Sequence, residues 1–265
     1  MIGVAGCGRM GLPMLMALRN AGLDAQGFDT RPQADFAGVP GAVTDDATAF
    51  SQNLETLISV VRDIPQTEEV LFTTQNFSAA PVLRRIIISS TLSPRYVRDL
   101  SSRVPDTITL IDAPMSGAQI AAEEARLSFM LGGSTEALDA AQPLFDAMGQ
   151  HFHRMGAYGA GMQSKVLNNL LAASNTAMTR LVLDWADQAG IEERALLDLI
   201  ATSSGQNWFA SGFDEIEFAR DGHEPDNTIS ILVKDVESAL DAAPHDADTA
   251  LPRQVQAAIR ALTAR

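Results

Sequence analysis

The chain has 265 residues, of which 46% are hydrophobic and 20% charged, so it is long enough for one large or two medium domains with buried cores. Its formal net charge of −14 argues against a nucleic acid or an anionic membrane as a partner, because both present phosphate groups that would repel it. A single cysteine excludes an internal disulfide, and no apolar run reaches the roughly 18 residues that span a bilayer, so we expect a soluble protein of a reducing compartment, the cytoplasm.

The first predicted elements, a strand over residues 1–5 and a helix over residues 12–20, flank a glycine-rich turn. The turn has the sequence Gly6-Cys7-Gly8-Arg9-Met10-Gly11. A G-x-G-x-x-G pattern between a strand and a helix is the fingerprint of dinucleotide-binding proteins. Gly6 permits the tight turn, Gly8 lets a pyrophosphate approach the backbone, and Gly11 lets the helix pack on the strand. We therefore expect the whole turn to bind a dinucleotide, with its phosphates on the N–H groups that begin the helix.

A second strand is predicted over residues 24–28, and it leads into Asp29-Thr30-Arg31. An acidic residue at this place, about 20 residues after the fingerprint, hydrogen-bonds the ribose of NAD and would repel the 2′-phosphate of NADP. Arg31 leaves NADP open as an alternative cofactor, because an arginine two residues after the acidic residue could bind the 2′-phosphate. We expect this segment to contact the cofactor, and we predict NAD, with NADP as the less favoured alternative.

Strands and helices continue to alternate along the first part of the chain. Further strands are predicted over residues 57–61, 86–89, 108–111, 127–131 and 151–155. A helix is expected near residues 66–72, and another begins with Ser93 as its cap and Pro94 in its first turn. This alternation predicts a parallel, doubly wound α/β sheet whose ligands lie beyond the carboxyl ends of its strands, where Thr91 and residues 112–118 are placed.

A second polar segment follows the strand predicted over residues 108–111. Its sequence is Asp112-Ala113-Pro114-Met115-Ser116-Gly117-Ala118. A Ser-Gly pair in a turn offers a hydroxyl and two accessible N–H groups, which suit a carboxylate ligand. An ordinary loop with a capping serine would show the same pattern, so this segment alone leaves the choice open.

A long helix is predicted over residues 161–189, with Gly190 as the left-handed residue that ends it. It would be roughly 43 Å long, more than a small domain is wide, so we expect it to belong to more than one packing unit. Apolar residues surround most of its circumference, which predicts burial on nearly all sides. Because one small helical domain can hardly cover every side, we expect a homodimer or homotetramer.

The first turns of this helix carry Lys165, Asn168 and Asn169. Lys165 and Asn169 are four residues apart and share one helix face, and Asn168 lies beside them. A lysine and two amides at the start of an otherwise apolar helix form a candidate site. The alternative is a lysine whose ammonium reaches solvent, with two asparagines at a frayed helix start.

After Gly190 the sequence indicates helices without strands, over residues 193–202, 208–220, 227–243 and 251–262. We therefore predict an α/β domain over residues 1–158 and an all-α domain over residues 159–265. Trp208 follows a polar segment between two of these helices. Lys234 interrupts an apolar run and, taken alone, is typical of a surface lysine in an ion pair.

Several segments together resemble the β-hydroxyacid dehydrogenase family, the group of 3-hydroxyisobutyrate dehydrogenase and tartronate semialdehyde reductase. The matching segments, in the family's order over nearly the whole chain, are Gly6-x-Gly8-x-x-Gly11-x-Pro13-Met14, Ser90-Thr91 with Ser93-Pro94, Asp112-Ala113-Pro114-Met115-Ser116-Gly117, Gly159-x-Gly161-x-x-x-Lys165-x-x-Asn168-Asn169 and Lys234-Asp235. The resemblance implies a Rossmann-type N-terminal domain, like that of 6-phosphogluconate dehydrogenase, which a long helix joins to a helical domain. It also implies hydride transfer between NAD(P) and a small 3-hydroxy acid or its semialdehyde, with no metal.

The same resemblance assigns roles to single residues. Lys165 would be the catalytic acid and base, and Asn169 would help to orient the substrate. The residues assigned to the substrate are Ser116, Gly117, Ala118, Asn168 and Trp208. Thr91 and Lys234 would line the cleft at the cofactor. The chain departs from the family pattern at Met115, where a valine is usual, and at Ala118, where a second glycine is usual, so the identity of the acid stays open.

Two other functions are compatible with parts of this pattern. An imine reductase uses the same two-domain plan, although such enzymes generally lack a lysine at position 165. A non-catalytic module that binds NAD or a partner protein would have a damaged catalytic set, whereas Lys165, Asn169 and Ser116 are all present.

Overall fold

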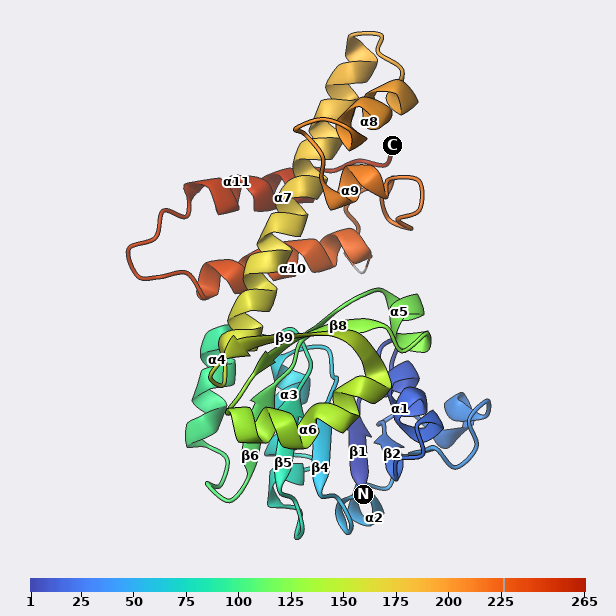
Figure 1. Cartoon of the computed structure of the whole chain (residues 1–265), viewed down its shortest axis with the longest axis vertical. Coiled ribbons are helices and arrows are strands. Elements are labelled where there is room, and N and C mark those ends of the chain that lie inside the picture. The colour runs from blue at the N-terminus through green and yellow to red at the C-terminus, as the bar shows by residue number, and fades with distance from the viewer. Residues whose placement is uncertain (226) are drawn as a thin grey trace. The chain divides into compact units, whose positions relative to one another are not determined.

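The computed structural model describes residues 1–225 and 227–265, which divide into two compact units, residues 1–165 and 166–265. The first unit contains a sheet with helices, and the second is helical (Figure 1). Within the described ranges, no helix is long and apolar enough to cross a membrane.

The first unit contains every strand that the sequence predicts, together with short elements that it does not. Its strands are β1 (Ile2–Ala5), β2 (Ala25–Phe28), β3 (Val43–Thr44), β4 (Thr56–Ser59), β5 (Arg85–Ile88), β6 (Thr109–Asp112), β7 (Met115–Ser116), β8 (Leu127–Gly132) and β9 (Gly149–Gly156). Its helices are α1 (Gly11–Asn20), α2 (Ala47–Ser51), α3 (Ile64–Leu71), α4 (Pro94–Asp99), α5 (Gln119–Glu123) and α6 (Thr135–Met148), with 3-10 turns at Gln33–Phe36, Phe77–Ala79 and Leu100–Ser102. The elements that the sequence analysis missed are β3, β7, α2, α5 and α6.

The sheet has the order β3-β2-β1-β4-β5-β6-β8-β7, and β9 pairs with β8. Strands β3 to β6 are parallel, as predicted. The expectation of parallel pairing is wrong beyond β6, because β8 runs antiparallel to both β6 and β7. Helix α5 has 5 residues and rises only about 7.5 Å, too little for the crossover that a parallel strand needs. Helix α6 has 14 residues, and the strand that follows it, β9, does run parallel to β8.

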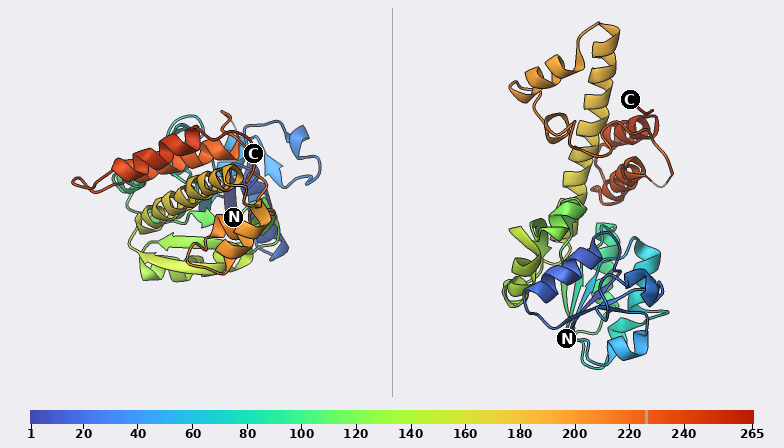
Figure 2. Two further views of the ribbon diagram at one scale, coloured as in Figure 1. Left: turned by 90° about the horizontal axis from the view of Figure 1, so that it is seen from above. Right: turned by 90° about the vertical axis from the view of Figure 1, so that its right-hand side faces the viewer.

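Helices cover both faces of the sheet, and the central strands are buried on both sides (Figure 2). Ile58 of β4 and Ile87 of β5 pack in one core with α1, α5 and α6. Their neighbours Leu57 and Ile86 pack in the other core with α2, α3 and α4. Because successive side chains of a strand point to opposite faces, a continuous apolar run is what such a doubly covered strand requires.

Helix α7 (Ala160–Gln188) is a single helix of 29 residues, and Gly190 follows it with a φ of +71°. It is about 43 Å long, as its sequence predicts. It begins in the first unit and continues through the second, so it contributes to the packing of both.

Two of the small cores of the second unit lie on different sides of α7 (Figure 2). Helices α10 (Thr228–Asp241) and α11 (Ala250–Arg260) enclose one core, and α8 (Glu193–Ala201) and α9 (Trp208–Ser211) contribute to the other. The helix predicted over residues 208–220 is wrong in length, because α9 ends at Ser211. The chain then turns, so that Phe213 and Ala219 pack in the second core.

The prediction that α7 is buried on nearly all sides is wrong for the single chain. Val166, Ala173 and Leu183 are fully buried, but one side of the helix carries large apolar residues that are 40–66% exposed. These residues, which we call the apolar face of α7, are Leu167, Leu171, Met178, Leu181 and Trp185. Their spacing places them within about a quarter of the helix circumference.

Arg180, which also lies on α7, points into the second unit and is only 2% exposed. Its guanidinium donates hydrogen bonds to the carbonyl oxygens of Ala219 and Asp221, each at 2.8 Å, and to that of Thr263. Burial lowers the pKa of Arg180. The side chain therefore joins α7 to the turn near residue 220 and to the segment after α11.

Candidate cofactor and active site

The glycine turn joins β1 to α1 in a conformation that requires glycine. Gly6 has a φ of +91°, and a Cβ atom on Gly11 would lie 1.9 Å from the carbonyl oxygen of Gly6. A Cβ atom on Gly8, by contrast, would meet no atom of the described residues within 4 Å, so this glycine faces open space. In residues 1–225 and 227–265, no side chain caps α1. The helix N-terminus is therefore a suitable cradle for a pyrophosphate.

Asp29 follows β2, and its carboxylate lies against this turn. Its Oδ2 accepts a hydrogen bond from the N–H of Cys7 at 2.9 Å. Arg31 binds the same carboxylate, with Nε 3.0 Å from Oδ1, and its Nη2 also donates to the carbonyl oxygen of Cys7 at 2.9 Å. Burial opposes ionisation of Asp29, but the hydrogen bonds from Arg31 and Cys7 outweigh burial and lower the pKa of the carboxyl. An ionised carboxylate, paired with Arg31, therefore lies beside the glycine turn.

Cys7 packs between β1 and β2, with its side chain buried behind the turn. Its Sγ lies 3.6 Å from the carbonyl oxygen of Val4 and 3.7 Å from that of Phe28. Burial, and then the charge of Asp29, raise the pKa of the Cys7 thiol to about 12. The side chain is therefore a neutral filler, and the residue can meet a cofactor only through its backbone.

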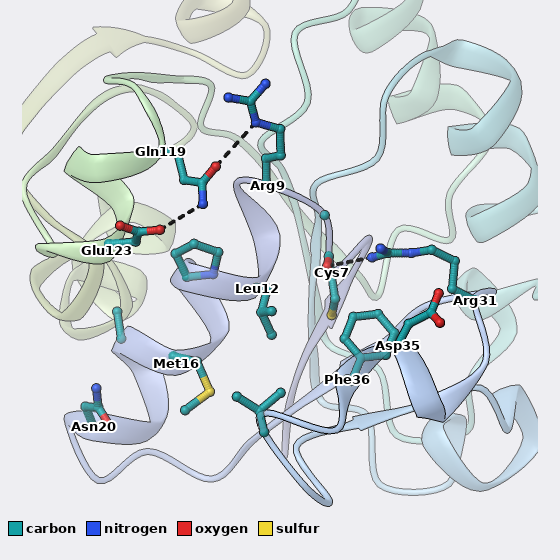
Figure 3. Close-up of a pocket in the computed structure, with 14 residues that line it drawn as sticks. Cys7, Arg9, Leu12, Met16, Asn20, Arg31, Asp35, Phe36, Gln119 and Glu123 are labelled. Carbon is teal, nitrogen blue, oxygen red and sulfur yellow. Dashed lines mark hydrogen bonds between the residues drawn. The ribbon is translucent and has the colours of Figure 1, made fainter.

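A cavity of about 430 Å³ opens beside the turn (Figure 3). The turn contributes Cys7, Gly8 and Arg9 to its wall, and Arg31 extends toward Cys7. The Nε of Arg9 donates to Gln119 at 3.3 Å, which joins the turn to α5. Arg9 and Arg31 thus flank the glycine turn, and Asp35 and Glu123 line the same cavity, so its wall carries charges of both signs.

The carboxyl ends of β4 and β5 carry buried hydroxyl groups next to Thr91. The Oγ atoms of Ser59 and Ser89 are buried and have no hydrogen-bond partner among the described residues. Buried hydroxyls are rarely left without a partner unless a ligand or water completes them. Together with the uncapped helix, the space at Gly8 and the charge of Asp29, they fit a dinucleotide such as NAD(P).

The segment proposed for the substrate does not contain a capping serine. Ser116 lies in β7 and pairs with Ser128 of β8, whereas Ala118 is the residue that precedes α5. Gly117 has a φ of +131°, and a Cβ on it would lie 2.8 Å from the side chain of Ala121. The alternative of an ordinary loop with a serine cap is therefore wrong, and the strand and the strained glycine hold Ser116 in place.

Lys165 does not extend into solvent, since it is only 8% exposed. It lies in the second turn of α7, so neither it nor the asparagines that follow stand at a frayed end. Asn169 is also buried, and its Nδ2 donates to Oδ2 of Asp235 at 2.7 Å. Asn168 is exposed and donates to Oδ1 of Asn169 at 3.4 Å.

Within the second unit, the structure joins Asn169 to α10 through Asp235, a residue that the sequence analysis left without a role. The signals for it were the interruption of an apolar run by Lys234 and Asp235 and the match of this pair to the family pattern. Lys234 is half-buried on the same helix, and Trp208 begins α9 with its ring half-exposed. Among the described residues, no group of histidine, cysteine, aspartate and glutamate side chains could hold a metal ion.

Comparison with known proteins identifies the family. Residues 1–158 match the family model of the NAD binding domain of 6-phosphogluconate dehydrogenase. Residues 159–265 match the model described as NAD-binding of NADP-dependent 3-hydroxyisobutyrate dehydrogenase. L-threonate dehydrogenase of Cupriavidus necator is 30% identical over 92% of this chain and 84% of its own length. NAD-dependent L-serine dehydrogenase of Pseudomonas aeruginosa is 31% identical over 78% of this chain and 71% of its own length.

A solved structure agrees with these matches. 3-Hydroxyisobutyrate dehydrogenase of Mycobacterium tuberculosis with L-serine superposes with a TM-score of 0.81 and 27% identity, over 97% of this chain and 91% of that one. The two family models together extend over the whole chain, and both describe parts of dehydrogenases. The chain is therefore an NAD(P)-dependent hydroxyacid dehydrogenase and belongs to the β-hydroxyacid dehydrogenase family.

Proposed function

We propose that the enzyme oxidises a small acid that carries a hydroxyl group on carbon 3, or reduces the corresponding semialdehyde. The observation that carries the proposal is the burial of Lys165, a lysine at the start of α7 in the unit that also contains the glycine turn. A lysine that is held inside this unit, and not extended into solvent, has an amine of fixed position, as proton transfer to or from a substrate oxygen requires.

The chemistry needs a proton acceptor as well as a hydride acceptor. The bound nicotinamide supplies the hydride acceptor in oxidation and the donor in reduction. Neutral Lys165 takes the proton from the substrate hydroxyl as the carbonyl forms, and in the reverse direction its ammonium returns that proton to the carbonyl oxygen. The ammonium also stabilises the negative charge that develops on this oxygen.

The remaining residues hold the substrate. The hydroxyl of Ser116 and the N–H groups of Gly117 and Ala118 bind the carboxylate, and Asn169 orients the substrate hydroxyl. The buried hydrogen bond from Asn169 to Asp235 supports this role, because it holds the amide in one orientation. We also assign Asn168 and Trp208 to substrate binding, and Thr91 and Lys234 to cofactor binding.

We propose NAD as the preferred cofactor, bound by the glycine turn and by Asp29, Thr30 and Arg31. The support is electrostatic: the carboxylate of Asp29 would repel a 2′-phosphate, and the guanidinium of Arg31 is held by that same carboxylate.

A panel of substrates tests both parts of this proposal. L-Threonate, L-serine and 3-hydroxyisobutyrate are offered with NAD and with NADP, and cyclic imines with both reduced cofactors, while the absorbance of the reduced nicotinamide is followed. We expect turnover of at least one acid, with kcat/KM at least about tenfold higher with NAD. Reduction of imines with no turnover of acids would refute the substrate class, and a preference for NADP would refute the role of Asp29.

We also propose that the protein is a homodimer or homotetramer in which the apolar face of α7 packs against a second copy of the chain. The support is a continuous row of large apolar residues on one helix, which the single chain leaves exposed. A helix with such a row pairs well with an identical helix, because residues of each can fill the gaps of the other.

Measurement of mass in solution by light scattering tests this assembly. We expect two or four chains at micromolar concentration, and a shift toward one chain for Met178→Glu, which places a charge in the middle of the apolar face. Leu251→Glu is the matched control, because Leu251 is 68% exposed on α11 and lies outside that face. A single-chain mass for the unmodified protein, or the same shift for both variants, would contradict the proposal.

Three further points stay proposals. We assign residues 1–158 to the cofactor-binding domain and residues 159–265 to a helical domain for substrate binding and dimerisation. We assign a small carboxylate as the substrate, and the net charge of −14 argues against a nucleic acid or a membrane surface as a partner. The lone buried cysteine supports a location in the cytoplasm.

A further inference from the structure

A buried carboxylate joins the sheet to the first turn of α7. Asp112 is the last residue of β6 and is 0% exposed. Its Oδ1 accepts a hydrogen bond from the N–H of Gly159 at 2.6 Å, and its Oδ2 accepts one from the N–H of Met162 at 2.5 Å. Gly159 directly precedes α7 and Met162 is the third residue of the helix, so a side chain from another element caps this helix.

Two glycines leave the space that this cap occupies. A Cβ on Gly132 of β8 would lie 2.1 Å from Oδ1 of Asp112, and a Cβ on Gly161 of α7 would lie 2.3 Å from the carbonyl oxygen of Met130. The first turn of α7 is therefore seated on β6 and β8 at backbone contact, with the carboxylate between them. Such contact leaves the start of the helix little freedom to shift or rotate.

Packing alone does not explain why the buried residue 112 is an aspartate and not an apolar residue. Burial raises the pKa of Asp112, and the N–H groups of Gly159 and Met162 only partly oppose this. An apolar residue would avoid the unfavourable burial of a charge. A carboxylate at this position does what an apolar residue cannot, because it binds two N–H groups at the positive end of the helix and fixes their direction.

Lys165 lies on the face of α7 that this contact orients. It follows Gly161 by four residues and Met162 by three, so it shares their side of the helix. A helical side chain also leans toward the turn before its own Cα, which here is the turn bound by Asp112. We propose that Asp112 is a positioning residue that sets the place of the Lys165 amine by fixing the start of α7. This inference rests on the proposed catalytic role of Lys165.

The first test compares two substitutions that change the same group. Asp112→Asn keeps the volume but replaces one acceptor oxygen with a donor, so one N–H of α7 loses its partner. We expect kcat to fall about 100-fold, the effect of a displacement of about 1 Å at a reacting group, while the Kd for NAD changes less than about twofold. The control is Asp46→Asn, because Asp46 caps α2 in the first unit and accepts from the N–H of Ala49 at 2.9 Å. That variant should keep its kcat.

The second test asks whether Asp112 acts through the lysine. Lys165→Ala is assayed with ethylamine added as a soluble replacement for the missing amine, with and without Asp112→Asn. If Asp112 only positions Lys165, the 100-fold loss shrinks to less than about threefold in this background, because the free amine does not depend on α7. The proposal would be overturned if Asp112→Asn lowered kcat about 100-fold both in the unmodified enzyme and in the rescued Lys165→Ala variant. It would also be overturned if Asp112→Asn and Asp46→Asn had equal kcat.

Further variants and a stability measurement distinguish failure of the proposed role of Lys165 from failure of the positioning role of Asp112. If Asp112→Asn does not fold, Asp112→Ser replaces it, since a serine hydroxyl can still accept from one N–H, and the same loss of kcat is expected. If Lys165→Ala alone keeps a kcat near that of the unmodified enzyme, the proposed function of Lys165 fails, and the positioning role fails with it. Asp112 variants that lose only thermal stability would show a structural cap, which contradicts the positioning role alone.

Discussion

Replacement of Lys165 by alanine is expected to lower kcat/KM for the hydroxy acid by about 10²- to 10⁴-fold, the usual contribution of a positioned acid or base. The Kd for NAD should change little, because the cofactor contacts are proposed at the glycine turn and Asp29. Steady-state kinetics with the best acid of the panel and calorimetric titration of NAD measure the two effects separately.

Two variants of the same position separate the proton transfer from the packing. Lys165→Met keeps the length of the buried chain without the amine, and we expect a loss as large as that of the alanine variant. Lys165→Arg keeps the positive charge, but a guanidinium does not give up its proton, so oxidation should stay slow. A kcat near the original value in the methionine variant would remove Lys165 from the proposed catalytic role.

Replacement of Arg180 by methionine is expected to lower the free energy of unfolding of the second unit by about 2–4 kcal/mol. The reason is the loss of its hydrogen bonds to Ala219, Asp221 and Thr263, whose carbonyl oxygens stay buried with no donor of similar reach. Urea unfolding monitored by tryptophan fluorescence measures this effect selectively, because Trp185 and Trp208 are the only tryptophans of the chain and both lie in the second unit.

The matched control for Arg180 is Arg194→Met. Arg194 also forms polar contacts, with Asp198 at 2.9 Å and Asp214 at 3.1 Å, but it is mostly exposed. Ion pairs at exposed positions contribute about 0–1 kcal/mol, so this variant should unfold at nearly the original urea concentration. Equal decreases in the free energy of unfolding for the two variants would show that the buried hydrogen bonds of Arg180 add no more stability than exposed ion pairs do. Both are compared at one protein concentration, since a dimer would make stability depend on it.

The parts of the fold that the sequence predicted well are those encoded by local spacing. The glycine turn, Asp29 after the second strand and the end of α7 at Gly190 each depend on residues close together in the chain, and the structure places all three as expected. The strand at Leu57 and Ile58 was likewise evident, because a strand covered on both faces must be apolar throughout.

The parts that the sequence could not predict depend on distant partners. Asp112 caps a helix that begins 48 residues later, and its hydrogen bonds span 47 and 50 residues of sequence. Arg180 binds carbonyl oxygens 39 to 83 residues away. Asn169 and Asp235 are separated by 66 residues. No period or motif relates such positions, so a buried polar residue is recognised as a link only when the fold brings its partner to it.

The burial of Cys7 at the centre of the glycine turn has a consequence for how the enzyme responds to oxidants. Burial raises the pKa of the Cys7 thiol to about 12, so the thiol stays protonated at pH 7, and the thiolate is the form that peroxides and alkylating reagents attack. Cys7 is the only cysteine of the chain, so the glycine turn presents no reactive thiolate to such reagents.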